Sequence, residues 1–149
     1  MPGFTFRLQN VLNYRIGLAD RARQELGALQ ARVREAEEKL ATLHRFEQRA
    51  LQELGEAQSA ALMDLPAIAR LLEYGQILTQ RIEEQRQVIA QRQQEADAQQ
   101  QQVIALAKDA RALEKLRERQ EEEHQQDDLR REQSETSEIA ASRHQRARV

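Results

Sequence analysis

Small or apolar residues recur at alternating steps of three and four through the first part of this chain. Only Arg15 and Glu47 interrupt the series. Its members are Leu12, Arg15, Ala19, Ala22, Leu26, Leu29, Val33, Ala36, Leu40, Leu43, Glu47, Ala50, Leu54, Ala57 and Ala61. A repeat of 3.5 residues sustained over this length is typical of a left-handed coiled coil. The series therefore predicts one long helix over residues 6–62.

A second series of the same kind follows a break in the pattern at residues 63–66. Asp64 is suited to capping new backbone N–H groups, and Pro66 is tolerated in the first turn of a helix but not in its interior. The second series is Leu71, Gly75, Leu78, Ile82, Gln85, Ile89, Arg92, Ala96, Gln99, Val103, Leu106, Ala110 and Leu113. These signals predict a turn at 63–66 and a second helix whose paired part covers 67–123.

The two series mesh if the helices fold back on each other. Folding about residues 64 and 65 pairs residues whose numbers sum to 128 or 129, which sets Leu26 against Val103 and Ala50 against Leu78. The predicted fold is all-α: an antiparallel two-helix coiled-coil hairpin forming a single domain over 1–149. Gln85, Arg92 and Gln99 occupy inward positions, so we expect the middle of the seam to be its least stable part.

The last part of the chain has no partner for its helix. Residues 124–149 are rich in charge and end in a basic stretch from Arg143 to Arg148. A charged helix without a packed face is marginal in water. We therefore expect an overhang that is frayed or disordered.

The residues do not assemble into a catalytic or ligand-binding pattern. His44, His124 and His144 are scattered and lack a second ligand at a suitable spacing, so we expect no metal and no cofactor. No glycine-rich phosphate loop or nucleophile turn is present, and the acidic residues lie among basic ones on predicted solvated faces. We expect no enzyme activity and no small-molecule substrate.

Composition restricts the remaining function classes. A formal net charge of −2 argues against nucleic-acid binding, which usually requires a strong basic excess. The chain has no Cys and no segment long and apolar enough to span a bilayer, and residues 1–12 lack the basic stretch and apolar run of a signal peptide. We therefore expect a cytoplasmic protein, and a self-contained hairpin is expected to be monomeric when free.

Three segments are candidates for recognition by other proteins. The first holds Phe4 and Phe6, which serve either as a docking patch or as a hydrophobic cap on the end of the coiled coil. The second is a helical stripe made of Tyr74, Leu78, Arg81 and Gln85, for which seam packing is the simpler interpretation because two members belong to the seam. The third is the basic end, either a solvated terminus or a membrane-surface segment.

Two stretches carry a resemblance to a known family. Residues 4–15 read FTFRLQNVLNYR, which resembles the F-x-F-x-L-x-x-V-L-x-x-R start of the flagellar export protein FliJ. Residues 108–119 read KDARALEKLRER, which is similar to the K-x-x-R-x-L-E-K-L-x-E-R stretch of that family. The resemblance extends over nearly the whole chain in length, helix order and turn position.

The resemblance implies a component of the flagellar type III export apparatus, with roles in protein transport, flagellum biogenesis and motility. Family members are coiled coils similar to the γ subunit of rotary ATP synthases. They insert in the hexameric ring of the export ATPase FliI, contact the export gate protein FlhA and bind export chaperones. Association with the cytoplasmic face of the inner membrane would then occur through the export apparatus.

The resemblance also assigns two contact sets. The set implied for the ATPase ring is Phe4, Phe6, Leu8, Leu12, Arg15, Leu113, Leu116 and Arg117. The set implied for the export gate is Tyr74, Leu78, Arg81 and Gln85.

Two alternatives remain open at the level of sequence. One is the equivalent coiled-coil protein of a virulence-type secretion injectisome. The other is a structural coiled-coil spacer or dimeriser with no ATPase partner.

Overall fold

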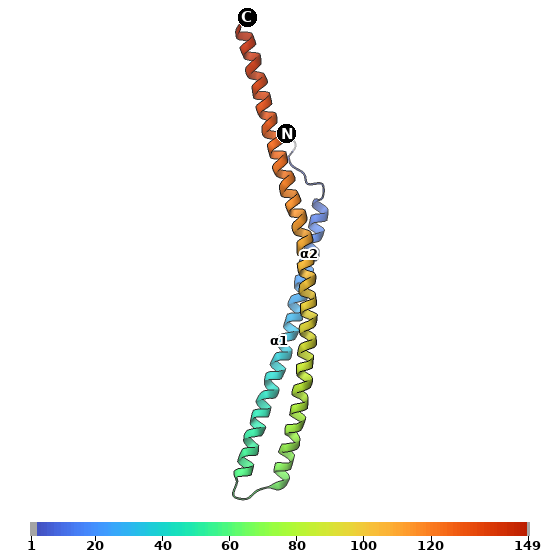
Figure 1. Cartoon of the computed structure of the whole chain (residues 1–149), viewed down its shortest axis with the longest axis vertical. Coiled ribbons are helices and arrows are strands. Elements are labelled where there is room, and N and C mark those ends of the chain that lie inside the picture. Colours follow the sequence, from blue (N-terminus) through green and yellow to red (C-terminus); the bar gives the residue numbers. More distant parts are fainter. Residues whose placement is uncertain (1–2, 149) are drawn as a thin grey trace. The chain divides into compact units, whose positions relative to one another are not determined.

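The structure, a computed structural model, describes residues 3–148 and contains two long helices. Helix α1 spans Gln9–Ser59 and helix α2 spans Leu65–Arg148 (Figure 1). Residues 3–148 include no β-strand, and the two helices pack against each other. The predicted all-α fold is therefore confirmed.

The helix boundaries follow from backbone capping. Before α1, the N–H of Gln9 donates to the carbonyl of Phe6 at 3.1 Å, which turns the chain into the helix. At the start of α2, the Oδ1 of Asp64 accepts from the N–H of Ala67 at 3.2 Å. Asp64 is thus the cap that the sequence predicted, and Pro66 lies in the first turn, where its missing N–H costs no helical hydrogen bond.

The predicted boundaries were wrong by a few residues at the turn. Helix α1 ends at Ser59 instead of residue 62, and the loop covers residues 60–64 instead of 63–66. The cause is that Ala60, Ala61 and Leu62, good helix formers by propensity, are needed to reverse the chain. Tertiary geometry therefore overrides local preference at these three positions.

Contacts divide the chain into two units. Unit 1 comprises residues 1–20 and 104–149, and unit 2 comprises residues 21–103. In unit 2 the buried side chains all belong to the predicted seams, and they are Ala22, Val33, Ala36, Ala50, Leu78, Ile82 and Ala96. In unit 1 they are Phe6, Leu12, Ala19 and Ala110. Each of these buried residues except Phe6 thus belongs to a predicted seam, while a single domain over 1–149 stays a prediction.

Two glutamines fix the alignment of the helices in unit 2. The Nε2 of Gln85 donates to the carbonyl of Ala36 at 2.9 Å, and the Nε2 of Gln99 donates to the carbonyl of Ala22 at 3.0 Å. The carbonyl of a helical residue points along the helix toward the following turn. Because Gln99 bonds the carbonyl of Ala22, its side chain lies level with residues 24–26 of α1. Gln99 also donates to Glu25 at 3.2 Å, in agreement with this level.

The register therefore differs from the predicted one. Opposing residues in unit 2 have numbers that sum to about 124, not 128 or 129, which is a shift of about half a heptad. The early end of α1 explains the shift, because Ser59 and Leu65 flank the loop and define the point about which the chain folds. The same side chains face the seam, but each meets different partners.

Helix α2 continues well past residue 123. It remains helical to Arg148, and every side chain from 129 to 148 is exposed. This stretch is rich in Arg, Glu, Gln and Ala, which favour helix even without packing, and Arg146 and Arg148 complement the helix dipole in the last turn. The structure thus has a regular helix where the sequence predicted a frayed or disordered overhang, and fraying in solution stays a prediction.

Candidate interaction surfaces

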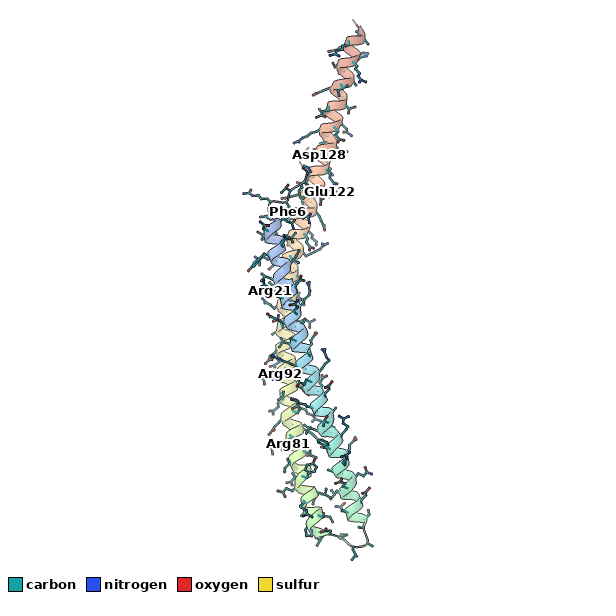
Figure 2. All side chains as sticks on the ribbon, turned by 180° about the vertical axis from the view of Figure 1, so that it is seen from behind. Phe6, Arg21, Arg81, Arg92, Glu122 and Asp128 are labelled. Carbon is teal, nitrogen blue, oxygen red and sulfur yellow. The ribbon has the colours of Figure 1, made fainter. Side chains whose placement is uncertain are left out.

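The two N-terminal phenylalanines pack onto α2 within unit 1. Phe6 is only 5% exposed, and Figure 2 places it against the stretch of α2 that carries Glu122 and Asp128. The ring of Phe4 lies 5.8 Å from that of His124, with the planes tilted by 45°. His124 is itself 3.3 Å from Asp128 through its Nε2. The arrangement matches the capping interpretation of this segment, since it covers the end of the seam.

The other residues of the predicted ring-contact set also lie in unit 1, at different depths. Leu12 is 2% exposed and belongs to the core. Leu113 and Leu116 are half-buried, whereas Leu8 and Arg117 are exposed. The set is therefore brought together, but Phe6 and Leu12 are buried and cannot meet a partner without a local rearrangement.

Arg15 joins the two helices of unit 1. Its Nη1 lies 3.7 Å from the Oδ2 of Asp109, and both side chains are about half exposed. An exposed ion pair of this length contributes little stability, since solvent screens it. Arg15 therefore keeps a charged group available at the surface.

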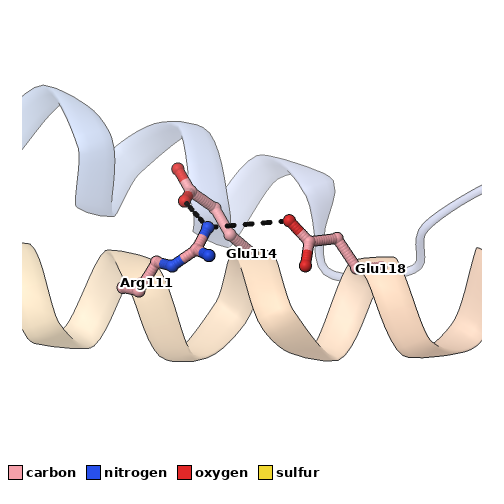
Figure 3. Close-up of polar contacts among 3 residues, drawn as sticks. All are labelled: Arg111, Glu114 and Glu118. Atoms are coloured by element: carbon pink, nitrogen blue, oxygen red, sulfur yellow. Dashed lines mark hydrogen bonds and ion pairs between the residues drawn. The ribbon is translucent and has the colours of Figure 1, made fainter.

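A cluster of charged side chains lies on the part of α2 that belongs to unit 1. The Nη1 of Arg111 is 3.2 Å from Glu114 and 3.6 Å from Glu118, so one guanidinium group lies between two carboxylates (Figure 3). All three side chains are partly exposed. The ion pairs run along one face of α2 and place charge of both signs on its surface.

Two exposed apolar side chains of unit 1 were not predicted as candidate contact residues. Val11 is 42% exposed and Tyr14 is 61% exposed. They lie one position before seam residues, and with Leu18 they repeat the three-four spacing on the flank of α1. This second spacing is the signal that would have found them.

The structure separates the predicted gate-contact stripe into two layers. Leu78 is 1% exposed and lies in the core, and Gln85 is half-buried through its bond to the Ala36 carbonyl. Tyr74 is 42% exposed and Arg81 is exposed. Only Tyr74 and Arg81 are thus available to a partner.

Two further residues extend this outer layer. Ile77 and Val88 are 44% and 38% exposed, and they follow Tyr74 and Arg81 along the same flank of α2. Neither residue was predicted, because the predicted stripe was centred on the seam. The available surface is therefore a mixed stripe on the flank.

The surfaces formed by the described residues contain no arrangement suited to holding a metal. Within residues 3–148, no group of three or more His, Cys, Asp or Glu side chains is close enough to bind a metal ion. Over the same residues, neither helix has a stretch that is apolar enough to cross a bilayer. What the described surfaces offer is charged and apolar side chains on long helices.

Long charged helices with narrow apolar seams and small exposed apolar clusters define a coiled-coil protein that presents surfaces to others. The chain belongs to the flagellar FliJ protein family, whose model matches residues 4–149. It is therefore a coiled-coil protein associated with flagellar export.

Comparison with curated proteins returned no match, and comparison with solved structures returned none either.

Proposed function

We propose that this protein is the coiled-coil stalk of the flagellar export ATPase. Unit 1 enters the ring of six FliI subunits, promotes assembly of the ring and stimulates its hydrolysis of ATP. The stripe of unit 2 that holds Tyr74 and Arg81 contacts the export gate protein FlhA, and export chaperones bind the same protein. These contacts bring it to the cytoplasmic face of the inner membrane.

The observation that carries the proposal is the unequal length of the helices in unit 1. Helix α1 begins at Gln9, and the N-terminal segment reaches α2 at His124. Beyond residue 128, α2 continues for twenty exposed residues, a length of about 30 Å. A single protruding helix gains stability from a partner that surrounds it.

An asymmetric pair of helices also suits a ring. Six identical ATPase subunits are equivalent until a partner without sixfold symmetry touches some of them differently. The exposed charges of unit 1, including Arg117, Arg111 and Arg15, lie on particular faces and would make different contacts with successive subunits. Such differences can bias which subunits bind and hydrolyse ATP.

The direct test adds purified full-length protein to purified FliI and measures ATP hydrolysis and ring assembly. We expect stimulation of both. A variant that lacks residues 129–149 should keep the helicity of the remainder and lose most of the stimulation. If the full-length protein changed neither hydrolysis nor assembly, the proposal would fail.

A matched variant separates the two proposed contacts. Tyr74→Ala lies in unit 2 and should leave the stimulation of FliI unchanged while weakening binding to the purified cytoplasmic part of FlhA. Loss of stimulation in this variant would contradict the assignment of the ring contact to unit 1. Sedimentation of the free protein as a monomer would separate the stalk from a dimeric spacer.

A further inference from the structure

A groove lies on one flank of unit 2, close to the loop that joins the helices. It has a volume of about 490 Å³ and is lined by side chains of both helices. The apolar members of its walls are Ala50, Leu51, Leu54, Leu71 and Leu72, and Glu47 is its one charged member. Leu51 is 62% exposed and Leu72 is 50% exposed, so the walls stand open to solvent.

The groove exists because a seam position lacks a side chain. Gly75 occupies an inward position in the second series, and a Cβ atom built on it would meet no atom within 4 Å. A leucine at this position would fill part of the space. In a coiled coil such a gap forfeits packing energy and destabilises the pair of helices.

The flank that bears the groove is also unusually free of charge. The two heptad positions that form it correspond to residues 41, 44, 48, 51, 55 and 58 of α1 and 65, 69, 72, 76 and 79 of α2. None of these eleven residues is Asp, Glu, Lys or Arg, although 32% of the chain is charged. The opposite flank over the same stretch carries Arg49, Glu53, Glu56 and Arg70. Depletion of charge marks the core of protein interfaces, so the uncharged flank differs from an ordinary solvated face.

We propose that this groove docks an amphipathic α-helix of a partner protein. Its length, set by Leu71 to Thr79 on α2, is about 13 Å, which accommodates two to three turns of a helix. Two parallel walls with a hollow between them are the surface onto which a third helix packs. The partner helix presents small or apolar uncharged residues to Leu51, Leu72 and Gly75.

The charges beside the groove define the edges of the partner. Glu73 is exposed on the outer side of α2 and Glu47 lines the groove, whereas the guanidinium of Arg45 donates to Thr42 on the opposite flank. A helix with basic residues along its edges complements these two carboxylates. This pattern defines the chemistry of the partner: an apolar face between two basic edges.

A second copy of the chain fits the groove less well. A stable dimer usually buries about 800 Å² on each partner. A groove of two to three turns, with two prominently exposed leucines, offers much less than that area. The contact suits a weak and reversible partner, and it lies on the opposite flank from Tyr74, so it is separate from the proposed gate contact.

The test uses full-length protein and a synthetic peptide of about fourteen residues as the probe. The peptide carries leucines on one helical face and lysines on both edges, and a scrambled isomer of the same composition is the control. Binding is followed by nuclear magnetic resonance of the leucine methyl groups. We expect saturable shifts at Leu51 and Leu72 with the amphipathic peptide only.

Gly75→Leu is the decisive variant. It should raise the thermal midpoint, because glycine disfavours helix and the new side chain fills a gap, and it should weaken peptide binding at least tenfold. A protein that is more stable but binds less cannot owe its defect to misfolding. The matched control is Gly27→Leu, which makes the same change at an open position about 30 Å away along α1 and should leave binding unchanged.

Several results would overturn the proposal. Equal binding by wild type and Gly75→Leu, or equal shifts with the scrambled peptide, would show that the groove does not select a helix. If the wild type sedimented as a dimer and Gly75→Leu sedimented as a monomer, the groove would be assigned to a second copy instead. Stimulation of FliI by Gly75→Leu should match that of wild type, so failure of this proposal is distinguishable from failure of the stalk function.

Discussion

Replacing both Gln85 and Gln99 by leucine should leave unit 2 folded but weaken its preference for one register of the two helices. Each glutamine donates to a carbonyl of the facing helix, at 2.9 and 3.0 Å, and each such bond contributes about 1 kcal/mol. Full burial of a leucine side chain contributes about 1.5–3 kcal/mol to stability, so leucine at each of these half-buried positions should contribute about half of that. The free energy of unfolding should therefore change by less than about 1 kcal/mol.

The preference for one register should change more. Both backbone acceptors belong to alanines, Ala22 and Ala36, whose small side chains leave the carbonyls accessible. A half-heptad shift would present Leu26 and Leu40 instead, and their larger side chains cover the backbone. Removing about 2 kcal/mol of directional bonding should raise the population of the shifted register roughly thirtyfold.

Spin labels at Glu53 and Gln101, both exposed, would measure the register by pulsed dipolar spectroscopy. In the register of the structure the two positions are about 45 Å apart along the axis, and a shift toward a sum of 128 shortens this to about 39 Å. We expect one distance in the wild type and a second, shorter one in the double variant. A single unchanged distance would show that the loop and the apolar packing alone set the register.

Three further substitutions test particular contacts. Phe6→Ala should destabilise the start of α1 by about 2–4 kcal/mol, because Phe6 is 5% exposed, and hydrogen exchange of the first turns would detect it; unchanged protection would contradict the capping role. Val33→Asp should collapse the helicity of unit 2, measured by circular dichroism at neutral pH, since a carboxylate would replace a side chain that is 6% exposed; a native spectrum would place Val33 outside the core. Asp64→Ala should cost about 0.5–1 kcal/mol in thermal unfolding by removing the bond to Ala67, with Asp64→Asn, which keeps a capping oxygen, as the control that retains most of the stability.

Much of the fold was accessible from the sequence because its signals are local and repeated. The three-four spacing predicted most of the residues that are buried, such as Ala22, Val33, Leu78 and Ala96 in unit 2. Asp64 was recognisable as a cap from its position before a helix-compatible proline. These features depend on helical periodicity and backbone hydrogen bonding, which act within a few residues.

The candidate surfaces were less accessible. The sequence placed Phe4 and Phe6 together but left docking and capping as equal alternatives, and the ring contact of Phe4 with His124 depends on which part of α2 lies beside it. The exposed flank residues Val11, Tyr14 and Ile77 were missed because the seam dominated the pattern. The groove beside Gly75 needed both helices in place before its walls could be assigned.

The sequence alone determined that two helices form, which faces they bury and where the chain turns to within a few residues. Tertiary structure decided which residue of α1 meets which residue of α2. A 3.5-residue repeat matches itself again after every half heptad, so apolar periodicity fits several registers almost equally well. The loop of residues 60–64 and the directional bonds of Gln85 and Gln99 select one of them.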